Sequence, residues 1–178
     1  MRTLVMAIAI AFGAAPAWAQ EAQNGVYDGR NIAGWSYSNE MAAAGGSPTW
    51  GPSDGSASTD GMNCNVRPAP VAATRAQWQG YFDGLTAEAF AAELANEGLA
   101  VEPGNRLTQF SAKGRPALRH EMTATVQGTR FQFQTVLISG ATTMLTLTCT
   151  VAEGQYEARL PLIESFMSGL QVQTAPAP

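Results

Sequence analysis

Residues 117–151 read ALRHEMTATVQGTRFQFQTVLISGATTMLTLTCTV, and this stretch decides the fold class of the chain. Apolar and polar side chains alternate along it with the period of two that is typical of β-strands. Gln127-Gly128 and Gly140 interrupt the alternation with residues that favour turns. The pattern predicts three strands, over 117–126, 130–139 and 142–151, joined as an antiparallel meander.

The last of these strands has two distinct faces, because successive side chains of a strand point to opposite sides. One face carries Leu145, Leu147, Cys149 and Val151, and the other carries Thr146, Thr148 and Thr150. An earlier alternating stretch over 62–66 puts Cys64 on the same face as Met62 and Val66. Both cysteines therefore have core-facing positions, which favours either two neighbouring strands of one sheet or two strands brought together at its edge.

Helical signals flank the meander. A helix is predicted over 87–97, with Thr86 as its N-cap and Gly98 as its end. Short strands follow at 99–101 and 107–110. Apolar residues at helical spacing also cover 155–170, where Pro161 predicts two helical pieces because proline lacks a backbone N–H.

Residues 1–19 have the pattern of a secretory signal peptide. Arg2 precedes an uncharged apolar run over 4–12, and Ala17-Trp18-Ala19 supplies the small residues of a cleavage site. Cleavage after Ala19 would deliver the protein to the periplasm or the medium. No later stretch of the sequence is long and apolar enough to predict a transmembrane segment.

Export determines how the two cysteines of the chain are interpreted. In an oxidising compartment, Cys64 and Cys149 are an even pair with one connectivity, which predicts a disulfide. The alternative is a free reactive thiol. Their wide separation fits neither a zinc site nor a C-x-x-C redox motif.

The segment before the alternating strands has a different composition. Residues 20–31 are polar, and 41–61 are rich in Gly, Ser and Pro, which predicts a long surface loop. We therefore expect an N-terminal segment over 20–61, one domain over 62–172 and a disordered tail over 173–178. Trp50 within the loop is either a contact residue for a partner or the residue that pins the loop to the domain.

Several motifs together resemble the PsbP-like family. They are GRPALR at 114–119, the strand at 131–137, LTLT at 145–148 and LIESF at 162–166. This family includes exported bacterial proteins related to a photosystem accessory protein, and a eukaryotic nuclear-transport factor that binds the GTPase Ran. The resemblance implies an α+β fold, an α/β/α sandwich with a central antiparallel sheet, and an accessory or binding role without catalytic residues. The Gly-rich loop and the cysteine pair depart from the family pattern.

Charge is distributed unevenly along a chain of 178 residues whose net charge is −4. Residues 83–102 hold five acidic side chains and no basic one, whereas 104–130 hold five basic side chains and one acidic. One interpretation is that the two segments complement each other within the domain. The other is a basic surface of Arg115, Arg119 and Arg130 that meets an acidic partner or an anionic ligand. The negative net charge argues against a general nucleic-acid binder.

His120 is the single histidine of the chain. It shares strand parity with Leu118 and Met122, which favours a core histidine; the alternative is a small secreted hydrolase that uses His120 with Glu121. Arg119 and Glu121 would pair on the opposite face. The sequence contains no G-x-S-x-G, P-loop, G-x-G-x-x-G or H-E-x-x-H motif, and we expect neither a metal nor a cofactor.

Trp78, Tyr81 and Phe82 form an aromatic cluster that is either core beneath the sheet or a partner surface. Taken together, these features predict an exported, non-catalytic accessory or binding protein. It would contact an envelope protein or an anionic ligand through its sheet or loop surface. A purely structural envelope component is a third possibility.

Overall fold

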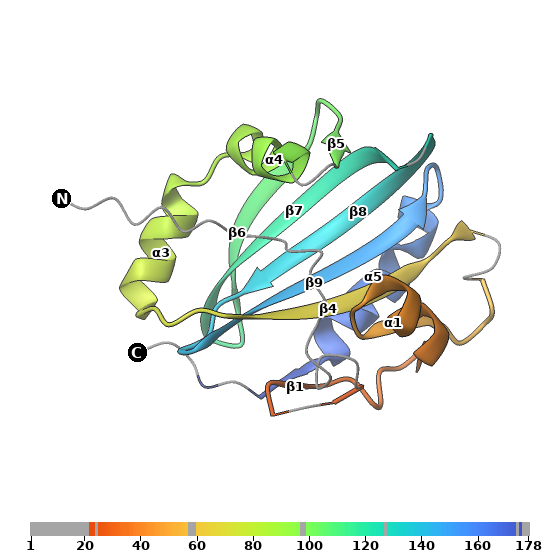
Figure 1. The fold of residues 1–178 in the computed structure, drawn as a ribbon, viewed down its shortest axis with the longest axis horizontal. Helices are drawn as coiled ribbons and strands as arrows, with labels where there is room; N and C mark the ends of the chain where they lie inside the picture. Colours follow the sequence, from red (N-terminus) through yellow and green to blue (C-terminus); the bar gives the residue numbers. More distant parts are fainter. Residues whose placement is uncertain are drawn as a thin grey trace.

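The computed structural model of the chain describes residues 22–23, 25–56, 60–96, 99–126, 128–173 and 175. The predicted meander is confirmed: β7 (Arg115–Val126), β8 (Thr129–Ile138) and β9 (Thr143–Ala152) are antiparallel neighbours. Figure 1 shows them side by side as the centre of the molecule. The predicted signal peptide, residues 1–19, lies outside the described residues.

Five further strands extend this centre into an eight-stranded antiparallel sheet. On the β9 side they are β4 (Asn63–Pro70), β3 (Thr49–Pro52) and β2 (Trp35–Tyr37). On the β7 side they are β5 (Ala100–Val101) and β6 (Arg106–Ala112), which pair with different parts of β7. A separate two-stranded ribbon joins β1 (Tyr27–Asp28) to β10 (Gln171–Val172).

Helices cover both faces of the sheet, so the predicted α/β/α sandwich is confirmed. The helices are α1 (Asn39–Gly45), α3 (Arg75–Gly84), α4 (Ala87–Asn96) and α5 (Tyr156–Gly169). Beneath α3 and α4 lies a core that includes Trp78, Phe82, Phe90, Leu94, Leu118 and Met122. Beneath α5, on the other face, lies a core that includes Trp50, Val66, Val136, Leu147, Ile163 and Phe166. The aromatic cluster of α3 is therefore core, with Trp78 and Phe82 no more than 1% exposed.

The prediction of a surface loop over 41–61 is wrong for most of that segment. Ser38 caps α1 by accepting a hydrogen bond from the backbone N–H of Met41, and β3 pairs with β4 inside the sheet. The expectation of a polar stretch over 20–31 also missed β1, whose Tyr27 is fully buried. The packed unit therefore begins before Met62. Gly and Pro do not prevent regular structure in this segment, because pairing with residues distant in the sequence fixes the backbone conformation.

β4 runs to Pro70, beyond the alternating stretch over 62–66 and through Pro68 and Pro70. The backbone N–H of Val66 donates to Pro48 O, so even-numbered residues of β4 present their N–H groups toward the β3 side. The two prolines have the same parity, and β3 pairs with β4 only at Asn65 and Cys64. The missing N–H groups thus fall on an open edge, where proline is tolerated.

α5 is one continuous helix, so the prediction of two pieces divided at Pro161 is wrong. Pro161 and Glu157, whose carbonyl loses its helical donor, are both exposed. Water can satisfy that carbonyl, which lowers the cost of proline at this position. Of the tail expected over 173–178, the structure describes Gln173, whose N–H donates to Val26 O, and Ala175, whose O accepts from Ala141 N–H. The other tail residues lie outside the described residues.

Within the described ranges, no helix is long and apolar enough to cross a membrane.

Candidate functional site

A groove of about 290 Å³ lies between α5 and the β6–β8 part of the sheet, and we call it the α5 groove. Its apolar lining is Phe110, Val136, Ile138, Met167, Leu170 and Val172. Its polar lining is Lys113, Arg119, Glu164 and Ser168. The groove exists because α5 packs over β9 and the core and leaves the β6 side of the same face uncovered. It is the one described hollow in which basic side chains meet a mainly apolar lining.

Arg119 is the central charged group of the α5 groove. It projects from β7 on the α5 face, in register with Thr108 on β6 and Val136 on β8. Its guanidinium lies 5.5 Å from the centre of the Phe110 ring, a cation–π distance. Nη1 is 3.2 Å from Oε1 of Glu164, whereas Nε is buried without a hydrogen-bond partner among the described residues. Arg119 therefore places a partly exposed positive charge inside a mainly apolar groove.

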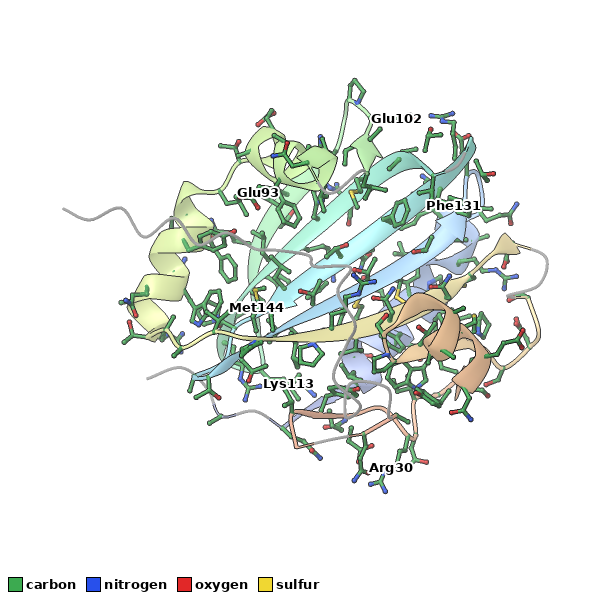
Figure 2. The ribbon with its side chains drawn as sticks, in the orientation of Figure 1. Arg30, Glu93, Glu102, Lys113, Phe131 and Met144 are labelled. Atoms are coloured by element: carbon green, nitrogen blue, oxygen red, sulfur yellow. A yellow bond between two sulfur atoms is a disulfide. The ribbon has the colours of Figure 1, made fainter. Side chains whose placement is uncertain are left out.

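Lys113 supplies a second cation at the turn between β6 and β7. Its φ of 51° and the φ of 77° at Gly114 are the paired left-handed conformations of a tight two-residue hairpin. The turn directs Lys113 toward the groove, where Nζ donates to Leu170 O at 3.2 Å. Figure 2 shows Lys113 at the opposite end of the sheet from Glu102.

A further hollow of about 310 Å³ lies near the beginning of α5, lined by residues that include Arg106, Glu121 and Tyr156. Its one cation is already paired, because Arg106 donates to Glu121 directly across β6 and β7. The Tyr156 hydroxyl donates to Gln134 Oε1 at 2.7 Å, and burial raises the pKa of that phenol to about 12. This hollow offers neither an unpaired cation nor an activated nucleophile.

The three arginines of the expected basic surface do not come together. Arg115 is 6% exposed, and Arg130 is in register with Thr125, ten residues further along β7. Arg130 pairs with Glu102 and Glu153, so at this position the acidic and basic segments complement each other within the domain. Only Arg119 of the three lines the α5 groove.

Trp50, the fourth predicted site residue, is 1% exposed. Its indole N–H donates to Gly29 O at 2.8 Å, and its ring packs edge-on against Tyr37 and Phe166. It therefore pins the N-terminal segment to the domain, and its ring is not accessible to a partner.

His120 is a core histidine, as its parity predicted. It is 1% exposed, and its Nε2 lies 2.9 Å from Asn105 Oδ1. The Phe90 ring packs against the imidazole, with the two ring centres 4.8 Å apart. Burial lowers the pKa of His120 to about 4, although the nearby Glu121 charge opposes this shift. Consecutive residues of β7 point to opposite faces, so His120 and Glu121 form no catalytic pair.

The pairing expected between Arg119 and Glu121 is also wrong. Glu121 pairs with Arg106, which is its direct register partner, and Arg119 reaches Glu164 on α5. No group of three or more His, Cys, Asp or Glu side chains in the described part of the chain is placed to hold a metal ion.

The predicted disulfide is confirmed. Cys64 on β4 and Cys149 on β9 are direct register partners with Cα atoms 4.0 Å apart, and both are fully buried. The bond joins the two core-facing positions that strand parity had indicated.

Phe110, Glu164 and Met167 are groove residues that sequence reasoning did not single out. One feature of the sequence could have indicated Phe110, because it is an isolated aromatic residue in the polar strand RLTQFSA. In the structure its side chain is 37% exposed, which is high for a large apolar side chain. Glu164 and Met167 became part of the site only through the packing of α5.

Comparisons with known proteins give structural matches only. No protein-family model and no curated protein matches the chain. The solved structures similar to it include cyanobacterial PsbP (CyanoP) from Synechocystis sp. PCC 6803, with 12% identity, a TM-score of 0.46, and coverage of 79% of this chain and 82% of that one. The PsbP-like family that the sequence motifs resemble is therefore represented among the similar solved structures.

Two other solved structures are similar over comparable lengths. LpqN, involved in cell envelope biogenesis of Mycobacterium tuberculosis, has 11% identity and a TM-score of 0.46, with coverage of 82% of this chain and 80% of that one. PA94, a Pseudomonas aeruginosa protein of unknown function, has 15% identity and a TM-score of 0.40, with coverage of 74% and 75%. Likeness at this distance concerns the fold alone.

Proposed function

We propose that this chain is an exported, non-catalytic binding protein whose α5 groove holds an acidic and apolar segment of a partner protein. The observation that carries the proposal is that Arg119, a cation whose Nε has no hydrogen-bond partner among the described residues, lies in the wall of a mainly apolar groove. A guanidinium recognises a carboxylate through paired N–H donors, and this pairing is stronger when it is shielded from water.

The apolar lining supplies the rest of the affinity. Val136 and Ile138 form the floor on the sheet, and Met167 is a flexible wall residue on α5 that adapts to different side chains. Burying one aliphatic side chain of a partner against this surface contributes about 1.5–3 kcal/mol. Lys113 at the other end adds a second attraction for an acidic segment.

Two features support export. Residues 1–19 have the signal-peptide pattern, and a buried disulfide is typical of proteins that fold in an oxidising compartment. In the native bacterium, mass spectrometry of the mature protein should find Gln20 as its first residue. An intact N-terminus beginning at Met1 would contradict export by this route.

The binding proposal is tested with a displayed library of random seven-residue peptides selected on the immobilised mature protein. Enriched peptides should contain both acidic and apolar residues, and calorimetry should measure the Kd of one of them. Arg119→Gln should weaken that peptide about tenfold or more, because a hydrogen bond to a charged group contributes about 1.5–3 kcal/mol.

Arg130→Gln is the matched control. It removes the same charge from the neighbouring strand of the sheet, at a site where Glu102 and Glu153 already satisfy the arginine. It should change the Kd less than about threefold. Equal effects of the two variants, or no enrichment of peptides over the bare support, would overturn the proposal.

A further inference from the structure

The free edges of the sheet are protected everywhere except at β6. β2 has three residues and β5 has two, and very short edge strands offer little for another strand to pair with. The open edge of β4 carries Pro68 and Pro70, whose missing N–H groups prevent pairing. β6 has seven residues and no proline, and no described strand pairs with its outer side.

The hairpin geometry fixes which backbone groups of β6 point outward. Ala112 and Arg115 flank a two-residue turn, so they form a hydrogen-bonded pair, and every second pair after them does the same. Pro116 O confirms this alternation, because it accepts from Ser139 N–H on the β8 side. The N–H and C=O groups of Leu107, Gln109 and Ser111 therefore point away from β7.

Both sides of the β6 edge are hollowed. The α5 groove lies on one side, with Phe110 and Ala112 of β6 in its lining. A second hollow of about 260 Å³, which we call the α3 hollow, is lined by residues that include Gln79, Gln109 and Ser111. A strand added to β6 would direct alternate side chains toward the two hollows, one mainly apolar with cations and the other lined by both polar and apolar residues.

From this arrangement we infer that β6 binds its partner segment as an additional β-strand. The inference rests on the proposed function, because the occupant is the same acidic and apolar segment. The backbone of this partner segment pairs with Leu107, Gln109 and Ser111. Its apolar and acidic side chains enter the α5 groove, and its polar side chains face the α3 hollow.

Charge favours a partner segment over a second copy of this chain. β6 contains one basic side chain, Arg106, and no acidic one, and Lys113 follows it immediately. Pairing β6 with β6 of a second copy would bring these cations together without any carboxylate from either strand. An acidic segment instead places its carboxylates beside Arg119 and Lys113.

The test compares Gln109→Pro with Gln109→Ala, using a peptide selected on the wild-type protein. Both variants lose the side-chain hydrogen bond from Gln109 to Phe82 O, but only proline removes the outward N–H. Gln109→Pro should weaken the peptide about tenfold more than Gln109→Ala does, because both variants lose the side chain and only proline loses the outward N–H. Equal Kd values for the two variants would overturn strand addition.

A second arm leaves the protein unchanged, so it does not depend on the folding of a variant. The same peptide is made with N-methyl groups on its odd residues or on its even residues. One of the two forms should lose at least about tenfold in affinity, because only every second N–H of a strand pairs with a given neighbour. Equal binding of both forms would contradict strand addition.

The outcomes separate the two proposals. Weakening by Arg119→Gln without weakening by Gln109→Pro would overturn strand addition and leave the groove proposal standing. A Kd that neither Arg119→Gln nor Gln109→Pro changes would overturn both the groove proposal and strand addition. Sedimentation equilibrium of the wild-type protein should show a monomer, and a dimer that Gln109→Pro dissociates would identify a second copy as the occupant instead.

Discussion

Arg119 on β7 and Glu164 on α5 face each other across the α5 groove, with Nη1 of the arginine 3.2 Å from Oε1 of the glutamate. Their side chains are 30% and 44% exposed. An ion pair of this exposure contributes only about 0–1 kcal/mol to stability. A carboxylate from a partner can therefore replace Glu164 at small cost.

Glu164→Gln should strengthen binding of an acidic peptide about threefold to tenfold, because it removes the carboxylate that competes for Arg119. Glu157→Gln is the matched control, since it makes the same charge change on an exposed residue of the same helix. Calorimetry of both variants with one selected peptide measures the difference. An equal gain in the two variants would show that only the overall charge matters.

His120 should make the protein less stable as the pH falls from about 6.5 to about 4. The pKa of His120 is lowered to about 4 by burial, below the ordinary value of 6.5, so the unfolded chain binds more protons in this window. The stabilising contribution is complete above pH 6.5 and is lost as the pH falls through 4. Its full size is about 3 kcal/mol.

The reference for this prediction is His120→Gln, which keeps a polar group near Asn105 Oδ1 but does not titrate. Denaturant unfolding at several pH values should show a steeper decline for the wild type than for the variant. Because His120 is the single histidine, its NMR titration is directly assignable. A titration midpoint near 6.5 would contradict the buried position.

Reducing the Cys64–Cys149 bond should lower the free energy of unfolding by about 4–5 kcal/mol, because the bond closes a loop with a sequence separation of 85. Denaturant unfolding with and without a reductant measures this loss. The double variant Cys64→Ala and Cys149→Ala should be insensitive to the reductant. Two titratable thiols in the denatured, unreduced protein would refute the disulfide.

The double variant Pro68→Ala and Pro70→Ala should make the protein self-associate. It restores two N–H groups on the open edge of β4, which can then pair with another chain. Sedimentation velocity over a range of concentrations should show the variant forming larger species while the wild type does not. The same behaviour in both proteins would mean that the prolines do not protect this edge.

Much of the sheet could be predicted from the sequence, because its strands alternate strictly and are separated by turn residues. The meander, the parity of Cys64 and Cys149, and the core position of His120 all follow from the period of two. α4 was predicted equally well because its signals are local: Thr86 Oγ1 accepts the backbone N–H of Ala89 as an N-cap.

β3 and β1 could not be predicted in this way. β3 has the sequence TWGP, whose Gly and Pro locally favour a loop. Pairing with β4 and the burial of Trp50 override that preference, and both come from residues distant in the sequence. The same holds for β1, which depends on β10 at the opposite end of the chain.

The candidate site was only partly predictable for the same reason. Arg119 was selected because a guanidinium suits an anionic partner, and it lines the α5 groove. Arg115 and Arg130 were predicted to join Arg119 because they are near it in the sequence. In the structure, Arg115 begins β7 at one end of the sheet, and Arg130 lies on β8 at the other end. Phe110 and Met167 meet only because α5 returns beside β6.

Amide hydrogen exchange, measured by NMR with and without a selected acidic peptide, tests the central claim most directly. The peptide should slow exchange at Leu107, Gln109 and Ser111, whose N–H groups point outward from β6. Thr108 and Phe110, which already pair with β7, should change little. Slowed exchange elsewhere on the protein, with those three outward amides unaffected, would contradict it.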